Sequence, residues 1–239
     1  MGIEIRGLTK KYKDVTAVNG LDLDIKSGEL FALLGVNGAG KTTTIKMLSG
    51  LTKPDAGSAK IMGISITDPK VKEVIAISPQ ETAVAPNLTV LENLCLMCGV
   101  HGFSKEKTAE KCTEMSEKLG LCDVLGKKAS KLSGGYMRRL SIAMALISGP
   151  QVLFLDEPTL GLDVLARADL WELIESLKGT ITVILTTHYM EEAEKLSDRV
   201  GIMKSGQLVA VGTARELCEL AGETKFEDAF VKIVKGAKI

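Results

Sequence analysis

A glycine-rich stretch that ends in lysine and threonine has the clearest chemistry in this sequence. Residues 35–42 read Gly-Val-Asn-Gly-Ala-Gly-Lys-Thr, which fits the pattern G-x-x-x-x-G-K-[ST]. Glycines let backbone N–H groups wrap around a phosphate, and a following helix adds its positive end. Lys41 would reach the phosphates, and the Thr42 hydroxyl would ligate Mg²⁺. An incidental lysine in a glycine-rich turn is the opposing interpretation, and the place of the stretch between an expected strand and an expected helix argues against it.

Two acidic residues follow an apolar run further along the chain. Asp156 and Glu157 come directly after 152–155, which we expect to be a buried strand. Sites in parallel α/β sheets lie outside the carboxyl ends of the strands. We therefore expect Asp156 to face the Mg²⁺ held by Thr42, and Glu157 to orient a water for attack on a phosphate. Two solvated acids in a strand-end turn are the alternative interpretation, and the pattern alone does not decide between them.

Two further polar residues stand where expected strands end. Gln80 follows the apolar segment 74–77, and His188 follows the segment 181–185 after two threonines. Beside a phosphate site, His188 is a candidate γ-phosphate contact. Each also has a purely structural interpretation, because strand ends are often polar and a lone histidine is more often structural than catalytic.

The composition limits the class of protein. The chain has 239 residues with 30 Lys+Arg against 30 Asp+Glu, a net charge of +0 and 45% hydrophobic residues, as in an ordinary globular domain. This balance argues against a dedicated nucleic-acid binder, which is usually basic. No apolar run approaches the ~20 residues that span a bilayer, and the N-terminus shows no secretory signal pattern.

The cysteines indicate a reducing compartment. Five are scattered along the chain, an odd number that does not suggest a disulfide framework. Cys95 and Cys98 form a C-x-x-C in an apolar helical stretch, and we find no second pair at ligand spacing. We interpret them as small hydrophobic residues on a helix face, and we expect the chain in the cytoplasm.

Hydrophobic periodicity divides the chain into elements. Alternation and apolar runs predict strands at 3–8, 21–25, 30–34, 74–77, 152–155, 181–185, 200–203 and 208–211. Helical spacing predicts helices at 41–51, 90–97, 105–119, 133–147, 164–178 and 189–196, and a tail helix carrying Phe226, Phe230 and Ile233. The stretch from about 87 to 149 is helical throughout and interrupts the α/β pattern, so we expect it to be an inserted subdomain.

Several motifs, taken in order, resemble those of the nucleotide-binding subunit of ABC transporters over nearly the full chain. The matching positions are Tyr12 for the aromatic residue that stacks on adenine, Gly35–Thr43 for Walker A, Gln80 for the glutamine before the helical arm, Leu132–Tyr136 for the signature motif, Asp156 and Glu157 for Walker B and its catalytic glutamate, Leu160–Asp163 for the loop facing the partner subunit, and His188 for the switch histidine.

This resemblance implies a fold. It is an α/β P-loop NTPase core of the RecA-like kind, with an antiparallel β subdomain and an inserted α-helical subdomain. The implied nucleotide-binding domain spans 1–223, with its core at 1–86 and 150–223 and its helical subdomain at 87–149. A C-terminal tail helix at 224–239 follows it.

The resemblance also implies site residues, with ATP and Mg²⁺ as cofactors. The implied catalytic residues are Lys41, Gln80, Glu157 and His188. The implied metal ligands are Thr42, Gln80 and Asp156. The implied nucleotide contacts are Tyr12, Gly35, Asn37, Gly38, Ala39, Gly40, Lys41, Thr42, Thr43, Ser133, Gly134 and Gly135.

The family works by head-to-tail dimerisation, in which the signature motif of one subunit caps the γ-phosphate bound by the other. We therefore expect a second ATPase copy, itself or a homologue, and a separate integral membrane permease as partners. The expected location is the inner face of the cell membrane. The segments 187–194 and 226–230 resemble the exporter branch that serves drugs, lipids, polysaccharides or sodium.

One position departs from the family pattern, and two other functions can be compared with the sequence. Tyr136 stands where many family members carry glutamine, so a polar contact from that side chain is in doubt. A P-loop GTPase would need a guanine-reading Asn-Lys-x-Asp, which the sequence lacks. The strongest alternative of another class is an ATP-gated binding module that does not hydrolyse ATP. Such a module would be expected to lose Glu157 or His188, and both are present.

Overall fold

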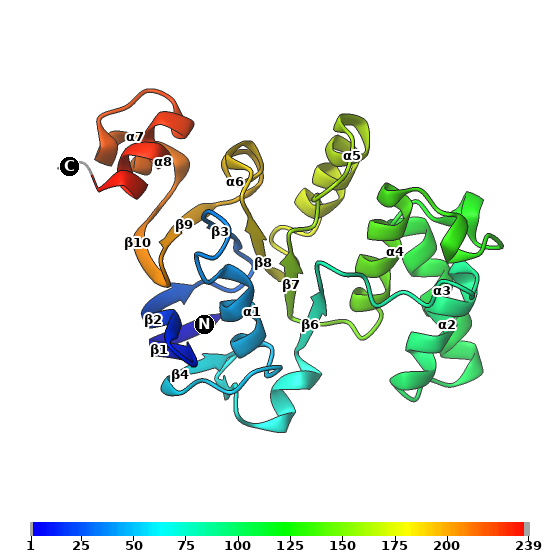
Figure 1. Cartoon of the computed structure of the whole chain (residues 1–239). Helices are drawn as coiled ribbons and strands as arrows, with labels where there is room; N and C mark the ends of the chain where they lie inside the picture. Colours follow the sequence, from blue (N-terminus) through cyan, green and yellow to red (C-terminus); the bar gives the residue numbers. More distant parts are fainter. Residues whose placement is uncertain (1, 237–239) are drawn as a thin grey trace.

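Within residues 2–236, which the computed structural model describes, a six-stranded sheet forms the middle layer of the molecule (Figure 1). All its neighbouring strands run parallel except β9 and β10, which are antiparallel at one edge. The strands in spatial order are β10 (Gln207–Gly212), β9 (Arg199–Lys204), β3 (Leu30–Leu34), β8 (Thr182–Thr187), β7 (Val152–Asp156) and β6 (Ile75–Ser78).

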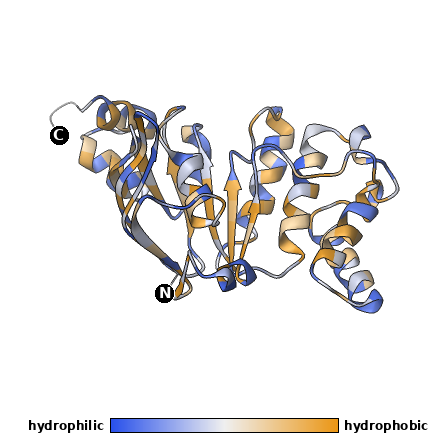
Figure 2. Ribbon diagram, turned by 60° about the horizontal axis from the view of Figure 1, so that its bottom comes forward, coloured by the Kyte–Doolittle hydropathy of each residue, from blue (hydrophilic) through white to orange (hydrophobic). Residues whose placement is uncertain are grey.

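Both faces of this sheet are buried, and the two-residue period of a strand explains how. Along β3, Leu30, Ala32 and Leu34 belong to one hydrophobic cluster, whereas Phe31 and Leu33 belong to another on the opposite face. The central strands are accordingly hydrophobic over most of their length (Figure 2), with polar residues at the ends of β7 and β8. A strand buried on both faces reads as a continuous apolar run, which is why the sequence predicts these strands well.

An antiparallel sheet and the helix after the glycine-rich loop cover one face. The sheet has the order β2–β1–β4–β5, and its residues share the second cluster with helix α1. The bounds are β1 (Ile3–Tyr12), β2 (Val15–Ile25), β4 (Ala56–Ile61), β5 (Ile64–Ser65), α1 (Lys41–Leu48) and the 3₁₀ turn η1 (Pro69–Glu73). The sequence analysis missed β4, because most residues of this strand are exposed and give no apolar alternation.

Helices cover the other face of the central sheet. Three of them, α2 to α4, lie together beyond β6 at one end of the molecule, and α7 and α8 lie at the opposite end (Figure 1). The helices are α2 (Val90–Val100), α3 (Lys105–Lys118), α4 (Gly134–Leu146), α5 (Val164–Glu175), α6 (Met190–Leu196), α7 (Ala214–Ala221) and α8 (Phe226–Lys235), with 3₁₀ turns η2 (Cys122–Val124) and η3 (Ala129–Lys131).

Local capping signals place two of these helices. Thr89 and Glu92 form a reciprocal capping box that starts α2, and Thr213 and Glu216 do the same for α7. Such a box satisfies two N–H groups that the first turn leaves unpaired. The sequence analysis did not predict α7. The predicted tail helix corresponds to α8, and residues 237–239 of that prediction lie outside the described residues.

Tertiary contacts bring together cysteines that are far apart in the sequence. Cys98 of α2 is buried and Cys95 is exposed, and the Sγ atom of Cys112 in α3 lies 3.6 Å from that of Cys95. The sequence analysis considered only local spacing and missed Cys112. In residues 2–236 no group of three or more His, Cys, Asp or Glu side chains is placed to hold a metal ion. Over the same residues, no helix combines the length and apolar composition needed to cross a membrane.

Candidate functional site

The glycine-rich loop connects β3 to α1, at the carboxyl end of the central strand. Gly40 is the N-cap of α1 with φ of 105°, and Gly38 has φ of 79°. These angles lie in the left-handed region that side chains disfavour. A Cβ atom at Gly40 would also collide with the carbonyl oxygen of Ala17. The loop therefore needs glycine there, and it leaves the N-terminus of α1 open to an anion.

Lys41 is the first residue of α1, and its side chain turns back over the loop. It is 4% exposed, and its Nζ atom donates to the carbonyl oxygens of Gly35 at 2.7 Å and Val36 at 3.3 Å. The same atom lies 3.5 Å from Oε1 of Glu157. Burial lowers the pKa of Lys41, and the nearby carboxylates of Glu157 and Asp156 oppose that shift.

Asp156 ends β7 next to Thr186 of β8, and its Oδ1 atom accepts two hydroxyl hydrogen bonds. One comes from Thr42 at 3.0 Å and the other from Thr186. A hydroxyl and a carboxylate this close can contact one cation together, and oxygen ligands are those that Mg²⁺ prefers. The donor set at the start of α1 and the end of β7 therefore fits the predicted magnesium site.

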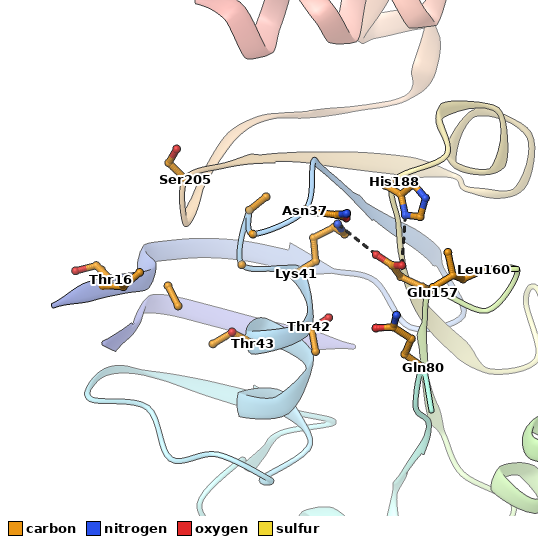
Figure 3. A pocket seen from close by; sticks show the side chains of 15 residues that line it. Thr16, Asn37, Lys41, Thr42, Thr43, Gln80, Glu157, Leu160, His188 and Ser205 are labelled. Carbon is orange, nitrogen blue, oxygen red and sulfur yellow. Dashed lines mark ion pairs between the residues drawn. The ribbon is translucent and has the colours of Figure 1, made fainter. Parts of the chain in front are cut away.

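Glu157 is held in an unusual backbone conformation. Its φ is 48°, in the left-handed region, and its N–H donates to the carbonyl oxygen and the hydroxyl of Thr186, each at 3.1 Å. Glu157 is 8% exposed, and its Oε2 atom lies 3.3 Å from Nδ1 of His188. Strained residues of this kind often occur at functional sites. The carboxylate thus lies between Lys41 and His188 (Figure 3).

The side chains of Lys41, Thr42, Glu157 and His188 border one cavity of about 810 Å³. It opens over the glycine-rich loop, and Gln80, Glu157 and His188 form its far wall (Figure 3). The predicted residues that line it are Asn37, Gly38, Ala39, Gly40, Lys41, Thr42, Thr43, Gln80, Glu157 and His188. The lining also includes Val15, Thr16, Ala17 and Ser205, which the sequence analysis missed, and Leu160, which it placed only in the loop expected to face a partner subunit.

The missed lining residues come from two segments that the fold brings to the glycine-rich loop. Val15 to Ala17 begin β2, and Ser205 lies in the turn between β9 and β10. The two segments are tied together because the N–H of Asn19 donates to the carbonyl oxygen of Gly206 at 2.8 Å. The residue types of these segments give no indication in the sequence that they line the cavity.

Not every predicted site residue faces the cavity. Tyr12 lies at the end of β1, 45% exposed and outside the cavity lining, with Nζ of Lys10 5.5 Å from its ring centre. Gly35 and Asp156 lie beneath the cavity rather than on its surface. Gly35 packs closely under the carbonyl oxygen of Met203.

The predicted signature motif lies elsewhere, at the start of α4. Ser133 occupies the N-cap position, but among the described residues its side chain makes no capping hydrogen bond. Together with Gly135 it borders a separate hollow of about 200 Å³, whose other lining residues are Tyr136, Arg139, Ala166 and Asp169. Within one chain, the structure therefore does not bring the signature motif to the cavity.

A buried arginine that the sequence analysis missed links α4 to the cavity wall. Arg138 donates to the carbonyl oxygens of Pro79 at 2.8 Å and Gln80 at 3.0 Å. Burial lowers the pKa of Arg138, and the carboxylates of Asp156 and Glu192 oppose that shift. The helix that begins with the signature motif therefore holds the backbone of Gln80 directly.

The fold and this geometry define a P-loop nucleotide-binding domain, and comparison with known proteins gives its family. The ABC transporter family model matches residues 18–160, more than half of the chain. A model described as AAA domain, putative AbiEii toxin, Type IV TA system matches the shorter stretch 129–192. The chain belongs to the ABC transporter family, which confirms the predicted family and fold class.

Similar proteins include ATP-binding proteins of resistance systems. The daunorubicin/doxorubicin resistance ATP-binding protein DrrA of Streptomyces peucetius is 41% identical over 219 residues, which is 90% of this chain and 66% of that protein. The linearmycin resistance ATP-binding protein LnrL of Bacillus subtilis is 41% identical over 93% of this chain and 73% of its own length. The human phospholipid-transporting ATPase ABCA3 is 41% identical, but the chain spans 13% of its length.

Two solved structures share the fold over most of the chain. One, titled as the ATP-binding subunit of an ABC transporter, has a TM-score of 0.85 and 27% identity, and the match covers 98% of this chain and 99% of that one. The other is a dimeric ATP-binding cassette in a post-hydrolysis state, bound to ADP and Pi. It has a TM-score of 0.79 and 27% identity, and the match covers 88% of this chain and 98% of that chain.

Proposed function

We propose that this chain binds and hydrolyses ATP as the nucleotide-binding subunit of an ABC exporter. The observation that carries the proposal is the position of Glu157, whose carboxylate lies 3.5 Å from Nζ of Lys41 and 3.3 Å from Nδ1 of His188 in the cavity wall. A carboxylate between a phosphate-binding lysine and a switch histidine can orient water for attack on a γ-phosphate.

Each neighbouring residue has a part in the proposed reaction. The loop N–H groups and the start of α1 would bind the phosphates, and Lys41 would neutralise them. Thr42 and Asp156, with Gln80 at the wall, would hold Mg²⁺, which supplies charge neutralisation during phosphoryl transfer. Glu157 would accept hydrogen bonds from the attacking water, and His188 would contact the γ-phosphate.

The second half of the proposed nucleotide site comes from another chain. Ser133, Gly134 and Gly135 would close over ATP bound at Lys41 of a partner, with Tyr12 of the binding chain against the adenine. The proposed partners are a second copy or a homologous ATPase and a separate membrane permease at the inner face of the cell membrane. The dimeric state of the similar ATP-binding cassette supports this arrangement, and the proposed subdomains are the core (1–86 and 150–223), the helical arm (87–149) and the tail (224–239).

Hydrolysis is tested by steady-state phosphate release. The proposal expects Mg²⁺-dependent release from the wild-type chain and a loss of about 10²–10⁴-fold in Glu157→Gln, the range that a positioned base contributes. ATP binding should persist in that variant. Binding without phosphate release by the wild-type chain would instead favour the ATP-gated binding module.

The two-chain site is tested by mixing two inactive variants. Lys41→Ala destroys the loop side and leaves the hollow at Ser133 intact, whereas Ser133→Arg does the reverse. A mixed pair then contains one site with both halves intact, so hydrolysis should return on mixing. If the mixture stays at the level of the separate variants, the nucleotide site is not shared between chains.

A further inference from the structure

Glu192 is a fully buried carboxyl with no part in the proposed mechanism. It lies in α6 with 0% exposure, four positions after His188 in the sequence. Its Oε1 atom accepts a hydrogen bond of 3.1 Å from Nε1 of Trp171 in α5. Burying a carboxyl costs free energy unless it is well paired, so its presence in this position calls for a reason.

The pairing of this carboxyl is incomplete. Among the described residues, its Oε2 atom has no hydrogen-bond partner, and neither has the buried hydroxyl of Thr159. Burial raises the pKa of Glu192, and the nearby hydroxyls of Thr187 and Thr159 and the indole of Trp171 oppose that shift. Unpaired buried polar atoms are uncommon in folded proteins. Among the described residues one further buried side-chain atom of this kind is Nδ1 of His188, in the proposed catalytic site.

The surrounding residues belong to the two segments that hold the reacting groups. Thr159 follows Glu157 by two positions, and Thr187 immediately precedes His188. The hydroxyl of Thr187 accepts a hydrogen bond from the N–H of Tyr189 at 2.9 Å, which leaves its own proton available to a carboxylate. The Glu192 carboxyl therefore lies near both segments whose side chains make the 3.3 Å contact, the one after Glu157 and the one before His188.

We propose that Glu192 is a positioning residue for ATP hydrolysis, whose buried carboxyl fixes the spacing between the Glu157 loop and the His188 segment. This role rests on the proposed ATPase function. Trp171 anchors the carboxyl to α5, which begins directly after the loop 160–163 expected to face a partner subunit. Glu192 thereby also links that loop to the hydrolytic site.

The test compares the turnover of two variants with that of a matched control. Glu192→Leu removes both oxygens, whereas Glu192→Gln keeps an acceptor for Trp171 and a polar group in place of Oε2. Glu191→Gln changes the exposed neighbour on the same helix. A misplacement on the order of 1 Å costs up to about 10²-fold in rate. We expect kcat to fall about 10- to 100-fold in Glu192→Leu, to recover largely in Glu192→Gln and to stay unchanged in Glu191→Gln, with ATP affinity within about twofold throughout.

A purely structural role gives a different result. In that case Glu192→Leu would lower the melting temperature while kcat per folded chain stayed at the wild-type value, and the proposal would be overturned. Should that variant fail to fold, Thr159→Val removes only the facing hydroxyl. The proposal expects a lower kcat from it, and a wild-type kcat would contradict the proposal.

A spectroscopic measurement separates this inference from the ATPase proposal. The chain has 2 histidines, so ring signals in an NMR spectrum can be assigned to His188 and to His101, which caps α2. Glu192→Leu should shift the His188 signals and leave those of His101 in place. That result would show that Glu192 positions His188 whether or not the wild-type chain hydrolyses ATP, and unshifted His188 signals would refute the inference.

Discussion

The glycine-rich loop at 35–42 (the loop side) and the segment 133–136 (the signature side) both lie at the start of a helix. They differ in how far the chain itself supplies partners for their polar groups. At the start of α1, the charged groups Lys41, Asp156 and Glu157 are buried and paired within the chain, around a cavity of about 810 Å³. At the start of α4, Ser133 borders a hollow of about 200 Å³, and among the described residues its side chain makes no capping hydrogen bond. This difference agrees with the proposal that a second chain completes the nucleotide site, because the polar partners of the first side lie within the chain and those of Ser133 do not.

Removing the charge on the loop side should have the largest effect. Lys41→Ala leaves phosphate charges without the only lysine in the glycine-rich loop, and a hydrogen bond to a charged group contributes about 1.5–3 kcal/mol. We expect ATP affinity to fall by at least about tenfold and hydrolysis to be abolished. Lys46→Ala, an exposed lysine on the same helix, is the control. Wild-type hydrolysis by Lys41→Ala would show that the loop is not the phosphate site.

Blocking the signature side should separate assembly from binding. Ser133→Arg fills the hollow with a bulky side chain, so ATP-dependent dimerisation should be lost while ATP binding at Lys41 of the same chain changes less than about threefold, within 1 kcal/mol. Sizing chromatography and equilibrium ATP binding measure the two effects. Ser130→Arg, at an exposed position just upstream, should alter neither. Loss of binding in Ser133→Arg would mean that the two sides are not independent.

Changing Tyr12 tests whether the nucleotide-binding surface extends from the glycine-rich loop to the end of β1. If the ring stacks on adenine, Tyr12→Ala should weaken ATP binding by about 1–3 kcal/mol, by analogy with base stacking on aromatic residues. Tyr12→Phe should be nearly silent, because it keeps the ring. Equal losses in the two variants would mean that the hydroxyl is the contact, and no loss in either would place the base against Val15 to Ala17 instead.

Alkaline pH should weaken ATP binding at the glycine-rich loop, and this is the smallest of the effects that we expect. Burial lowers the pKa of Lys41 below its ordinary value, so this lysine loses its proton at a lower pH than an exposed lysine does. ATP needs the charged form, and its affinity should therefore decline as pH rises through that lowered pKa. Titration of ATP binding between about pH 7 and 10 measures the decline, and Lys41→Arg should flatten it because a guanidinium stays charged. An equal decline in Lys41→Arg would assign the effect to another group.

The contrast also explains what could be predicted from the sequence. Apolar runs such as Leu30–Leu34 and the glycine-rich loop after it carry their information locally, and the structure has them as expected. β4 was missed because its exposed residues resemble a turn, and α7 because this short helix buries only Leu217 and Ala221 and so offers few apolar positions.

The missed contributors to the site have no local signal. Arg138 lies in the middle of a helix and reads as a surface charge, and it is buried because α4 packs beside the segment that carries Gln80. Glu192 stands next to another glutamate, and only the turn of α6 decides that it points inward while Glu191 is exposed. Polar residues inside a domain are set by tertiary packing, which the sequence pattern does not show.

The central claim is that ATP completes the signature side by joining two copies of the chain. Light scattering on purified Glu157→Gln, with and without Mg·ATP, tests it most directly, because the bound nucleotide should persist in that variant. Without nucleotide the mass should be that of one chain, 25.5 kDa, and with saturating Mg·ATP it should double. A mass that remains at 25.5 kDa under saturating Mg·ATP would contradict the account.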